Sequence, residues 1–187
     1  MKTPYNEIVN IASIGSQTNP ISLNEILRKA NDEQLTPAAQ NKERVLFLGI
    51  DVQQDFMDNG ALGVPGAHGD VERITEFIYN NMDKITNIAV SIDTHTPHQI
   101  FHPCWWIDEN GNNPAPYTPI TLADLDSGKY RAVIYPRQSR DYVEHLEKDG
   151  KKTLCVWSYH CLQGTSGAAF ENQFANMIYF HSVAKKA

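Results

Sequence analysis

Acidic, histidine and cysteine residues stand at the ends of three short apolar runs of the sequence. They are Asp51, Asp93 with His95, and His160 with Cys161. A carboxylate and two imidazoles suit a borderline divalent metal ion, and a carboxylate that closes an apolar run suits general acid or base work. A cysteine beside a histidine could instead form a nucleophile and its base. The sequence therefore offers metal, acid/base and thiol chemistry.

The metal interpretation rests on Asp93, His95 and His160. Asp93 and His95 are two residues apart, so on a regular strand they would share a face. With His160 from a neighbouring strand, they would give three ligands and leave positions open for water or substrate. Zn²⁺, Mn²⁺ and Fe²⁺ all accept this ligand set, and His98 or His102 could be a fourth ligand. The alternative is that Asp93 caps a loop and His95 is a hydrogen-bonded loop histidine.

Asp51 and Cys161 each have more than one interpretation. An acid such as Asp51 is costly to bury, so it serves acid/base chemistry, holds a cationic partner or caps backbone amides. Cys161 could use His160 as its base, but neighbours on an extended strand point to opposite faces. We therefore expect Cys161 to be a small buried residue and not a nucleophile.

The elements that must position these residues form a parallel α/β sheet. A continuous apolar run at 45–50 and a second segment of similar character at 87–92 predict strands that are buried on both faces. Apolar residues recur between them at helical spacing, at Val71, Ile74, Phe77, Ile78 and Met82. Strand, helix and strand predict a βαβ unit, and "KTLCVW", residues 152–157, predicts a third strand. Ligands bind beyond the carboxyl ends of such strands, so the reactive residues should meet at one rim.

The remaining segments are expected to surround this sheet. Residues 1–43 lack a strand-like run and predict an arm with one helix, capped by Ser22 and Glu25. The arm would pack on the domain of residues 44–187 or on another subunit. The Pro-, Gly- and Asn-rich stretch 97–136 predicts a long functional loop. Further helices are expected at residues 139–148 and 168–183.

Composition narrows the class of protein. The chain has 187 residues, is 41% hydrophobic and carries a net charge of -6 without a Lys/Arg cluster, which argues against a nucleic-acid partner. No apolar run approaches the length of a membrane span, and the N-terminus lacks a signal-peptide stretch. The three cysteines are an odd number, which favours reduced thiols and a cytoplasmic location.

Three segments resemble the motifs of a known family, and they occur in the same order: "IDVQQDF", "SIDTHTPHQIF" and "WSYHCLQGTSGAAF". The family is that of the isochorismatase-like cysteine hydrolases, which includes the nicotinamidases, and the resemblance covers residues 44–183. It implies a three-layer, Rossmann-like α/β sandwich with a parallel sheet. It also implies hydrolysis of a small amide-type (C–N) substrate.

The resemblance implies a role for each site residue. The metal ligands that it implies are Asp93, His95 and His160. Asp51 would be the catalytic acid/base, and Phe56 and Trp157 would flank a flat substrate ring. In this interpretation His160, and not Cys161, is the functional member of the His–Cys pair.

The family's catalytic triad of Asp, Lys and Cys is only partly represented. Its lysine and nucleophilic cysteine belong to later segments, and the sequence ends at Ala187 before either is expected. Lys185 follows a helical stretch and is expected to be a solvated terminal lysine. We therefore expect a sheet without its C-terminal strands, whose open edge and uncovered apolar surface favour a homo-oligomer. The alternatives are a non-catalytic metal- or small-ligand-binding module of the same fold, and a hydrolase that uses Cys161 or a metal hydroxide.

Overall fold

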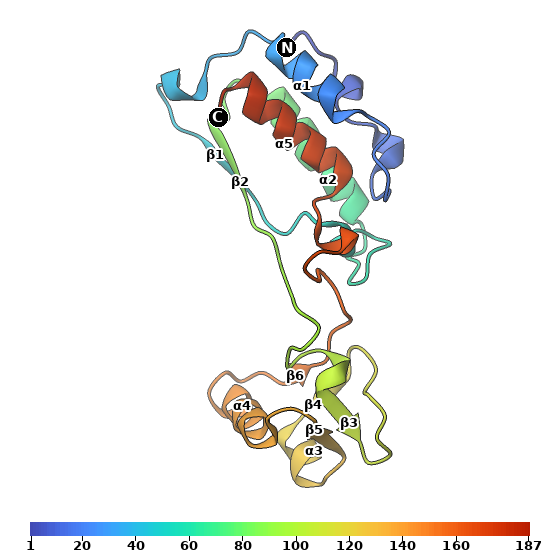
Figure 1. Cartoon of the computed structure of the whole chain (residues 1–187). Coiled ribbons are helices and arrows are strands. Elements are labelled where there is room, and N and C mark those ends of the chain that lie inside the picture. The colour runs from blue at the N-terminus through green and yellow to red at the C-terminus, as the bar shows by residue number, and fades with distance from the viewer. The chain divides into compact units, whose positions relative to one another are not determined.

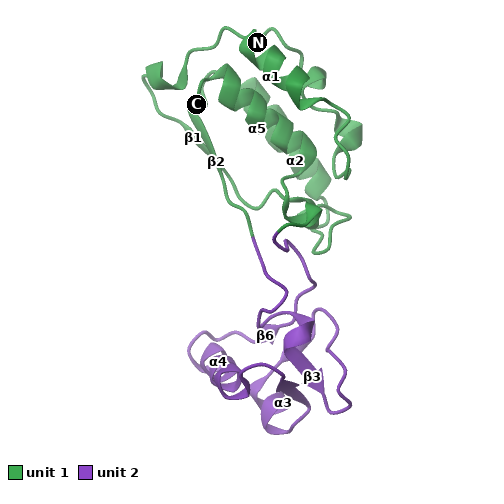
Figure 2. Ribbon diagram, in the orientation of Figure 1, with its two compact units in different colours: residues 1–93, 164–187 green, residues 94–163 purple.

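The computed structural model describes residues 1–187 and contains two compact units. Unit 1 is formed by residues 1–93 and 164–187, and unit 2 by residues 94–163 (Figure 2). The chain therefore enters and leaves unit 2 once. The domain boundary expected between residues 43 and 44 stays a prediction, and residues 1–43 are built into unit 1.

A parallel pair of strands is the sheet of unit 1. β1 (Leu46–Gly49) pairs in parallel with β2 (Asn87–Val90), with Leu46 opposite Asn87 and Gly49 opposite Val90. α2 (Ala67–Asn80) connects the two strands, as the apolar periodicity between them predicts. The α/β class with a parallel βαβ unit is therefore confirmed (Figure 1).

Helices cover one face of this strand pair. α5 (Asn172–Ala184) packs against α2, β2 and α1 (Leu23–Asn31), and these helices gather on the same side of the pair in Figure 1. Side chains alternate along β1, so Phe47 packs into the core while Leu46 and Leu48 are 61% and 56% exposed. The expectation that this strand is buried on both faces is wrong, because every second side chain of the apolar run lies on the uncovered face.

The core of unit 1 draws on the N-terminal segment as well as on α5. The buried residues of this cluster include Ile8, Val9, Ile26, Phe174 and Phe180. The N-terminal arm therefore packs on the domain of its own chain, which is one of the two expected arrangements. The expected capping box is wrong, because Ser22 makes no side-chain cap bond and Glu25 pairs with Lys29 at 2.7 Å instead.

Lys185, which follows α5 directly, is fully buried, so the expectation that it is solvated is wrong. Its Nζ donates to the backbone oxygen of Asp83 at 2.7 Å and lies 3.3 Å from the Asp83 carboxylate. Its own carbonyl oxygen accepts the N–H of Ala38 at 2.7 Å. A buried ammonium needs such partners, and here they come from segments that are distant in the sequence.

Unit 2 consists of short strands and two helices. The strand pairs are antiparallel, β3 (Trp106–Asp108) with β5 (Tyr130–Ala132) and β4 (Pro119–Ile120) with β6 (Leu154–Cys155). The helices are α3 (Leu122–Asp126) and α4 (Pro136–Lys148). The segment "KTLCVW" therefore contributes β6 to unit 2 and does not extend the parallel sheet, which corrects the expectation of a third strand there.

The core of unit 2 is small and apolar. Trp106, Ile120, Val143 and Val156 are fully buried in one cluster. The stretch 97–136, expected to be a long loop, thus contains β3, β4, α3 and β5 and contributes to this core. Its short elements carry no regular apolar period, which explains why the sequence pattern suggested a loop.

Six 3₁₀ turns complete the chain, at Tyr5–Glu7, Ile11–Ser13, Ala38–Gln40, Gln54–Phe56, Pro103–Trp105 and Ser166–Ala168. The turns Gln54–Phe56 and Ser166–Ala168 lie against each other in unit 1. None of the helices combines the length and hydrophobicity that crossing a membrane would require. The cytoplasmic location expected from the cysteines stays a prediction.

Candidate functional site

The side chains of Asp93, His95 and His160 converge. Their ligand atoms all lie within 4.8 Å of one another, and the ring centroids of the two histidines are 4.8 Å apart. His160 is buried, and Asp93 and His95 are partly buried. One carboxylate and two imidazoles at this spacing could share one borderline divalent ion. The convergence expected from the sequence is therefore present in the structure.

Backbone hydrogen bonds hold the two histidines side by side. The N–H of His95 donates to the oxygen of Cys161 at 2.9 Å, and the N–H of Gln163 donates to the oxygen of His95 at 2.9 Å. Nδ1 of His160 lies 2.8 Å from the carbonyl oxygen of Ser158. Because a carbonyl can only accept, Nδ1 of His160 donates in this contact, and Nε2 is the ring nitrogen that could bind a metal ion.

His102 adds a third imidazole to this region. It is fully buried, and its ring centroid lies 5.8 Å from that of His95 and 6.2 Å from that of His160. Its Nδ1 lies 3.0 Å from the oxygen of Pro97, whereas its buried Nε2 has no hydrogen-bond partner. Burial lowers the pKa of His102, which favours the neutral ring that a metal ion requires. His98, the other candidate for a fourth ligand, is exposed.

Asp51 and Phe56 line one cavity of unit 1, with a volume of about 270 Å³. The other lining side chains are mostly apolar, but the carboxylate of Asp70 also lines this cavity and was not expected from the sequence. Asp51 has a left-handed backbone with a φ of 54° and accepts a hydrogen bond from Ser91 at its Oδ1. A carboxylate that lines a mostly apolar cavity can exchange a proton with a ligand bound there.

The two aromatic residues expected to flank a substrate ring belong to different units. Phe56 lies in unit 1 and Trp157 in unit 2. The ring of Trp157 packs edge-on against Tyr117, with centroids 6.0 Å apart, and the residue is 38% exposed. An accessible indole of this kind can stack on a flat ring. The joint role of Phe56 and Trp157 stays a prediction.

Cys161 is fully buried, which confirms the expectation of a small buried residue. The reason differs from the one that the sequence suggested. Cys161 has a φ of 46°, so it lies in a left-handed turn and not on an extended strand. A thiol with no exposed surface is not placed to attack a substrate.

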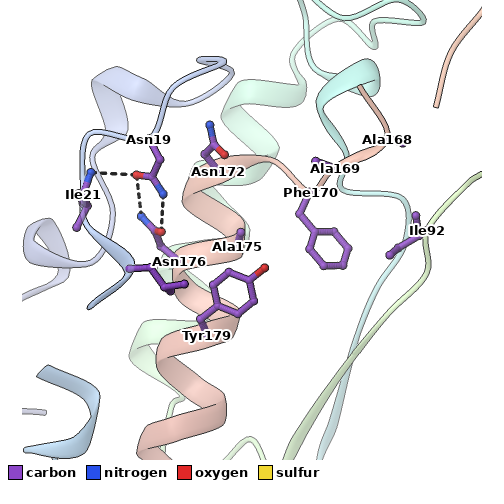
Figure 3. Close-up of a pocket in the computed structure, with 11 residues that line it drawn as sticks. Asn19, Ile21, Ile92, Ala168, Ala169, Phe170, Asn172, Ala175, Asn176 and Tyr179 are labelled. Carbon is purple, nitrogen blue, oxygen red and sulfur yellow. Dashed lines mark hydrogen bonds between the residues drawn. The ribbon is translucent and has the colours of Figure 1, made fainter. Parts of the chain in front are cut away.

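A larger cavity, of about 540 Å³, lies elsewhere in unit 1 (Figure 3). Its wall includes Phe170, Tyr179 and the amides of Asn19 and Asn176, which hydrogen-bond to each other at 2.7 Å. Its lining residues include no carboxylate, thiol or imidazole, and none of the expected site residues. The residues expected from the sequence to carry chemistry therefore lie outside this cavity, in the group of Asp93, His95 and His160 and in the cavity lined by Asp51.

Of the comparisons with known proteins, only the one with solved structures finds proteins that are similar to this chain. No family model matches the chain, and no curated protein matches it. Two structures of the yeast nicotinamidase are similar to it, one of them bound to the inhibitor nicotinaldehyde. Their sequence identities are 20% and 18% and their TM-scores 0.47 and 0.46, and each similarity covers 73% of this chain and 52% of that chain.

A nicotinamidase and pyrazinamidase from Acinetobacter baumanii is a further neighbour, with 21% identity and a TM-score of 0.40. The similarity covers 72% of this chain and 47% of that chain. The chain thus spans about half the length of these solved structures. The activity of a whole enzyme of this kind is therefore a proposal for this chain.

Proposed function

We propose that the chain provides the metal-binding part of a cysteine hydrolase related to the nicotinamidases, which cleaves the C–N bond of a small amide. One observation carries this proposal. The ligand atoms of Asp93, His95 and His160 lie within 4.8 Å of one another although they come from two motifs far apart in the sequence. Both motifs are among those that resemble this family.

A divalent ion such as Zn²⁺, Mn²⁺ or Fe²⁺ would be held by Asp93, His95 and His160. The fit is supported by His102, whose buried Nε2 lacks a hydrogen-bond partner and would be satisfied by a cation or by a polar ligand beside it. When bound, such an ion supplies Lewis-acid polarisation of an oxygen atom.

Asp51 would take or give a proton at its carboxylate. The proton would be exchanged with a ligand bound in the mostly apolar cavity that Asp51 and Phe56 line. The faces of Phe56 and Trp157 would contact a flat substrate ring. Cys161 is not assigned as the nucleophile, because its thiol is fully buried.

A metal- or small-ligand-binding module without hydrolysis is the second candidate function. The burial of Cys161 favours this second function, because the fully buried thiol beside His160 is not placed to act as a nucleophile. The two functions share the metal site and differ in turnover.

Metal titration of the purified chain tests the shared part. We expect one Zn²⁺ per chain by isothermal titration calorimetry, and loss of most of the affinity in Asp93→Asn, His95→Ala and His160→Ala. His98→Ala is the matched control, because His98 is exposed and lies outside the converging group. Absence of zinc binding in the wild type, or unchanged binding in the ligand variants, would contradict the metal site.

Turnover separates the two functions. Ammonia release from nicotinamide and from small aliphatic amides is measured for the chain and, if the reading frame is longer, for its full product, with Asp51→Asn as the matched variant. Hydrolysis that depends on Asp51 supports the hydrolase. Metal binding without amide turnover in either protein supports the binding module.

A further inference from the structure

The side chain of Gln53 holds the backbone of Asp93 at both of its polar groups. Oε1 of Gln53 accepts the N–H of Asp93 at 2.7 Å, and Nε2 donates to the carbonyl oxygen of Asp93 at 2.9 Å. Nε2 also donates to the carbonyl oxygen of Ala168 at 2.8 Å. Gln53 is fully buried, so water does not compete for these bonds.

These bonds take the place of a neighbouring strand. β2 ends at Val90, so the ladder to β1 no longer fixes the backbone at Asp93. A primary amide offers two donors and an acceptor in one plane, and both donors and the acceptor are used here. A carboxylate of the same size has no donor, and a thioether has no donor and only a weak acceptor. Glutamine is therefore the residue that this position requires.

Gln53 is itself fixed by the backbone of unit 1. Its N–H donates to the oxygen of Asp51 at 2.8 Å, and the residue forms an isolated antiparallel bridge with Phe170. Asp51, Asp93 and Phe170 all belong to unit 1. Gln53 thus links the turn at Asp51 to the segment that carries Asp93.

We propose that Gln53 is the positioning residue of the metal site. By holding the peptide groups on both sides of Asp93, it fixes the direction from which the Asp93 carboxylate reaches the ion. The inference rests on the proposed function, because it requires Asp93, His95 and His160 to bind one ion. Partners outside the ligand shell typically contribute about 10–100-fold to metal affinity.

Cobalt titration of the whole chain tests this role, since the visible absorption of Co²⁺ reports its ligand geometry. Gln53→Met removes all three bonds at similar size, and Gln53→Glu keeps the acceptor oxygen but removes both donors. Gln54→Met is the matched control. Gln54 is also buried, but its amide donates to the oxygen of Ser16 at 3.3 Å and not to Asp93.

We expect both Gln53 variants to bind Co²⁺ about 10–100-fold more weakly with an altered visible spectrum, and Gln54→Met to stay within about twofold of the wild type. Circular dichroism identifies the folded variants, and one folded Gln53 variant is sufficient. A folded Gln53 variant with wild-type affinity and spectrum overturns the role of Gln53 and leaves the proposed function standing. A wild-type chain that binds no Co²⁺ overturns the proposed function, and this inference with it.

A measurement on the wild type keeps the inference testable if neither variant folds. The amide hydrogen of Asp93 is bonded to a fully buried side chain, so its exchange with solvent should be slow. Fast exchange of this amide would show that Gln53 does not hold Asp93.

Discussion

The hydroxyl oxygen of Ser91 lies 2.5 Å from Oδ1 of Asp51, and the N–H of Asp51 donates to the same hydroxyl oxygen at 3.1 Å. Because this oxygen accepts from the N–H, its own proton is directed to the carboxylate. The pair holds Asp51 in a left-handed backbone that costs an ordinary residue about 1–2 kcal/mol. Ser91 thus fixes both the backbone and one carboxylate oxygen of the residue to which we assign proton transfer.

Ser91→Ala should lower the free energy of unfolding by about 1–3 kcal/mol, because it removes a hydrogen bond to a charged group and a partner of the Asp51 N–H. Ser91→Thr keeps the hydroxyl and should recover much of this loss. Urea denaturation of the three proteins measures the difference. Equal stability of Ser91→Ala and the wild type would contradict a stabilising role for this pair.

Cys161 should be the slowest of the three cysteines to react with a maleimide in the native chain. It is fully buried, whereas Cys104 and Cys155 are partly exposed. Peptide mass spectrometry after timed labelling gives the order, and labelling in urea provides the control in which all three should react alike. Native labelling of Cys161 at the rate of Cys104 would contradict its burial and restore it as a candidate nucleophile.

His181 should make the chain less stable in mild acid. Burial lowers the pKa of His181, whose Nε2 donates to the oxygen of Ile85 at 3.0 Å. The unfolded chain, in which histidine titrates near pH ~6.5, therefore binds a proton more readily than the folded one. The stability from neutral His181 is fully present above that pH and is lost as the pH falls below it. Urea midpoints measured from about pH 7 to about pH 5 should fall accordingly.

His181→Gln is the variant that isolates this effect, because glutamine can still donate a hydrogen bond to Ile85. This substitution should reduce the change of the urea midpoint between about pH 7 and about pH 5. Burial shifts the pKa of His102 in the same direction, so some slope should remain. Burial raises the pKa of Glu171, whose contribution is instead lost as the pH rises above the unfolded value of 4.5. An unchanged slope in His181→Gln would contradict the assignment.

Self-association is expected through the uncovered face of the β1–β2 pair. Leu46, Leu48 and Ile50 are each at least half exposed there, which is a large apolar area for a monomer. We propose a homo-oligomer, and Leu48→Lys should shift it toward the monomer because a charge in an apolar interface is costly. Light scattering coupled to gel filtration measures the mass. Tyr142→Lys, an exposed position on α4, is the control. A wild-type chain that stays monomeric at high concentration would contradict the proposal.

The βαβ unit and the pairing of Asp93 with His95 could be predicted because each depends on local pattern, whereas the convergence of His160 with them is expected from motifs far apart in the sequence. An apolar run gives a strand, a 3.6-residue period gives α2, and the Asp93–His95 spacing places two ligands together. Unit 2 could not be predicted, since strands of two or three residues carry no period. The burial of Lys185 depends on Asp83, a partner that no local pattern identifies.

Residues 94–163 form a continuous insert, since the chain leaves unit 1 after Asp93 and returns to it at Gly164. The entering and leaving segments are neighbours, because His95 bonds through its backbone to both Cys161 and Gln163. When the two ends of an insert lie close together, the length of the chain between them can vary with little effect on the fold of the unit that carries it. His95 and His160 lie near the two ends of the insert, so the stretch between them can be shortened, extended or exchanged while the distance between the two side chains is kept. A single contiguous segment of the gene can thus be replaced to change what surrounds the metal ligands, with the core of unit 1 left as it is.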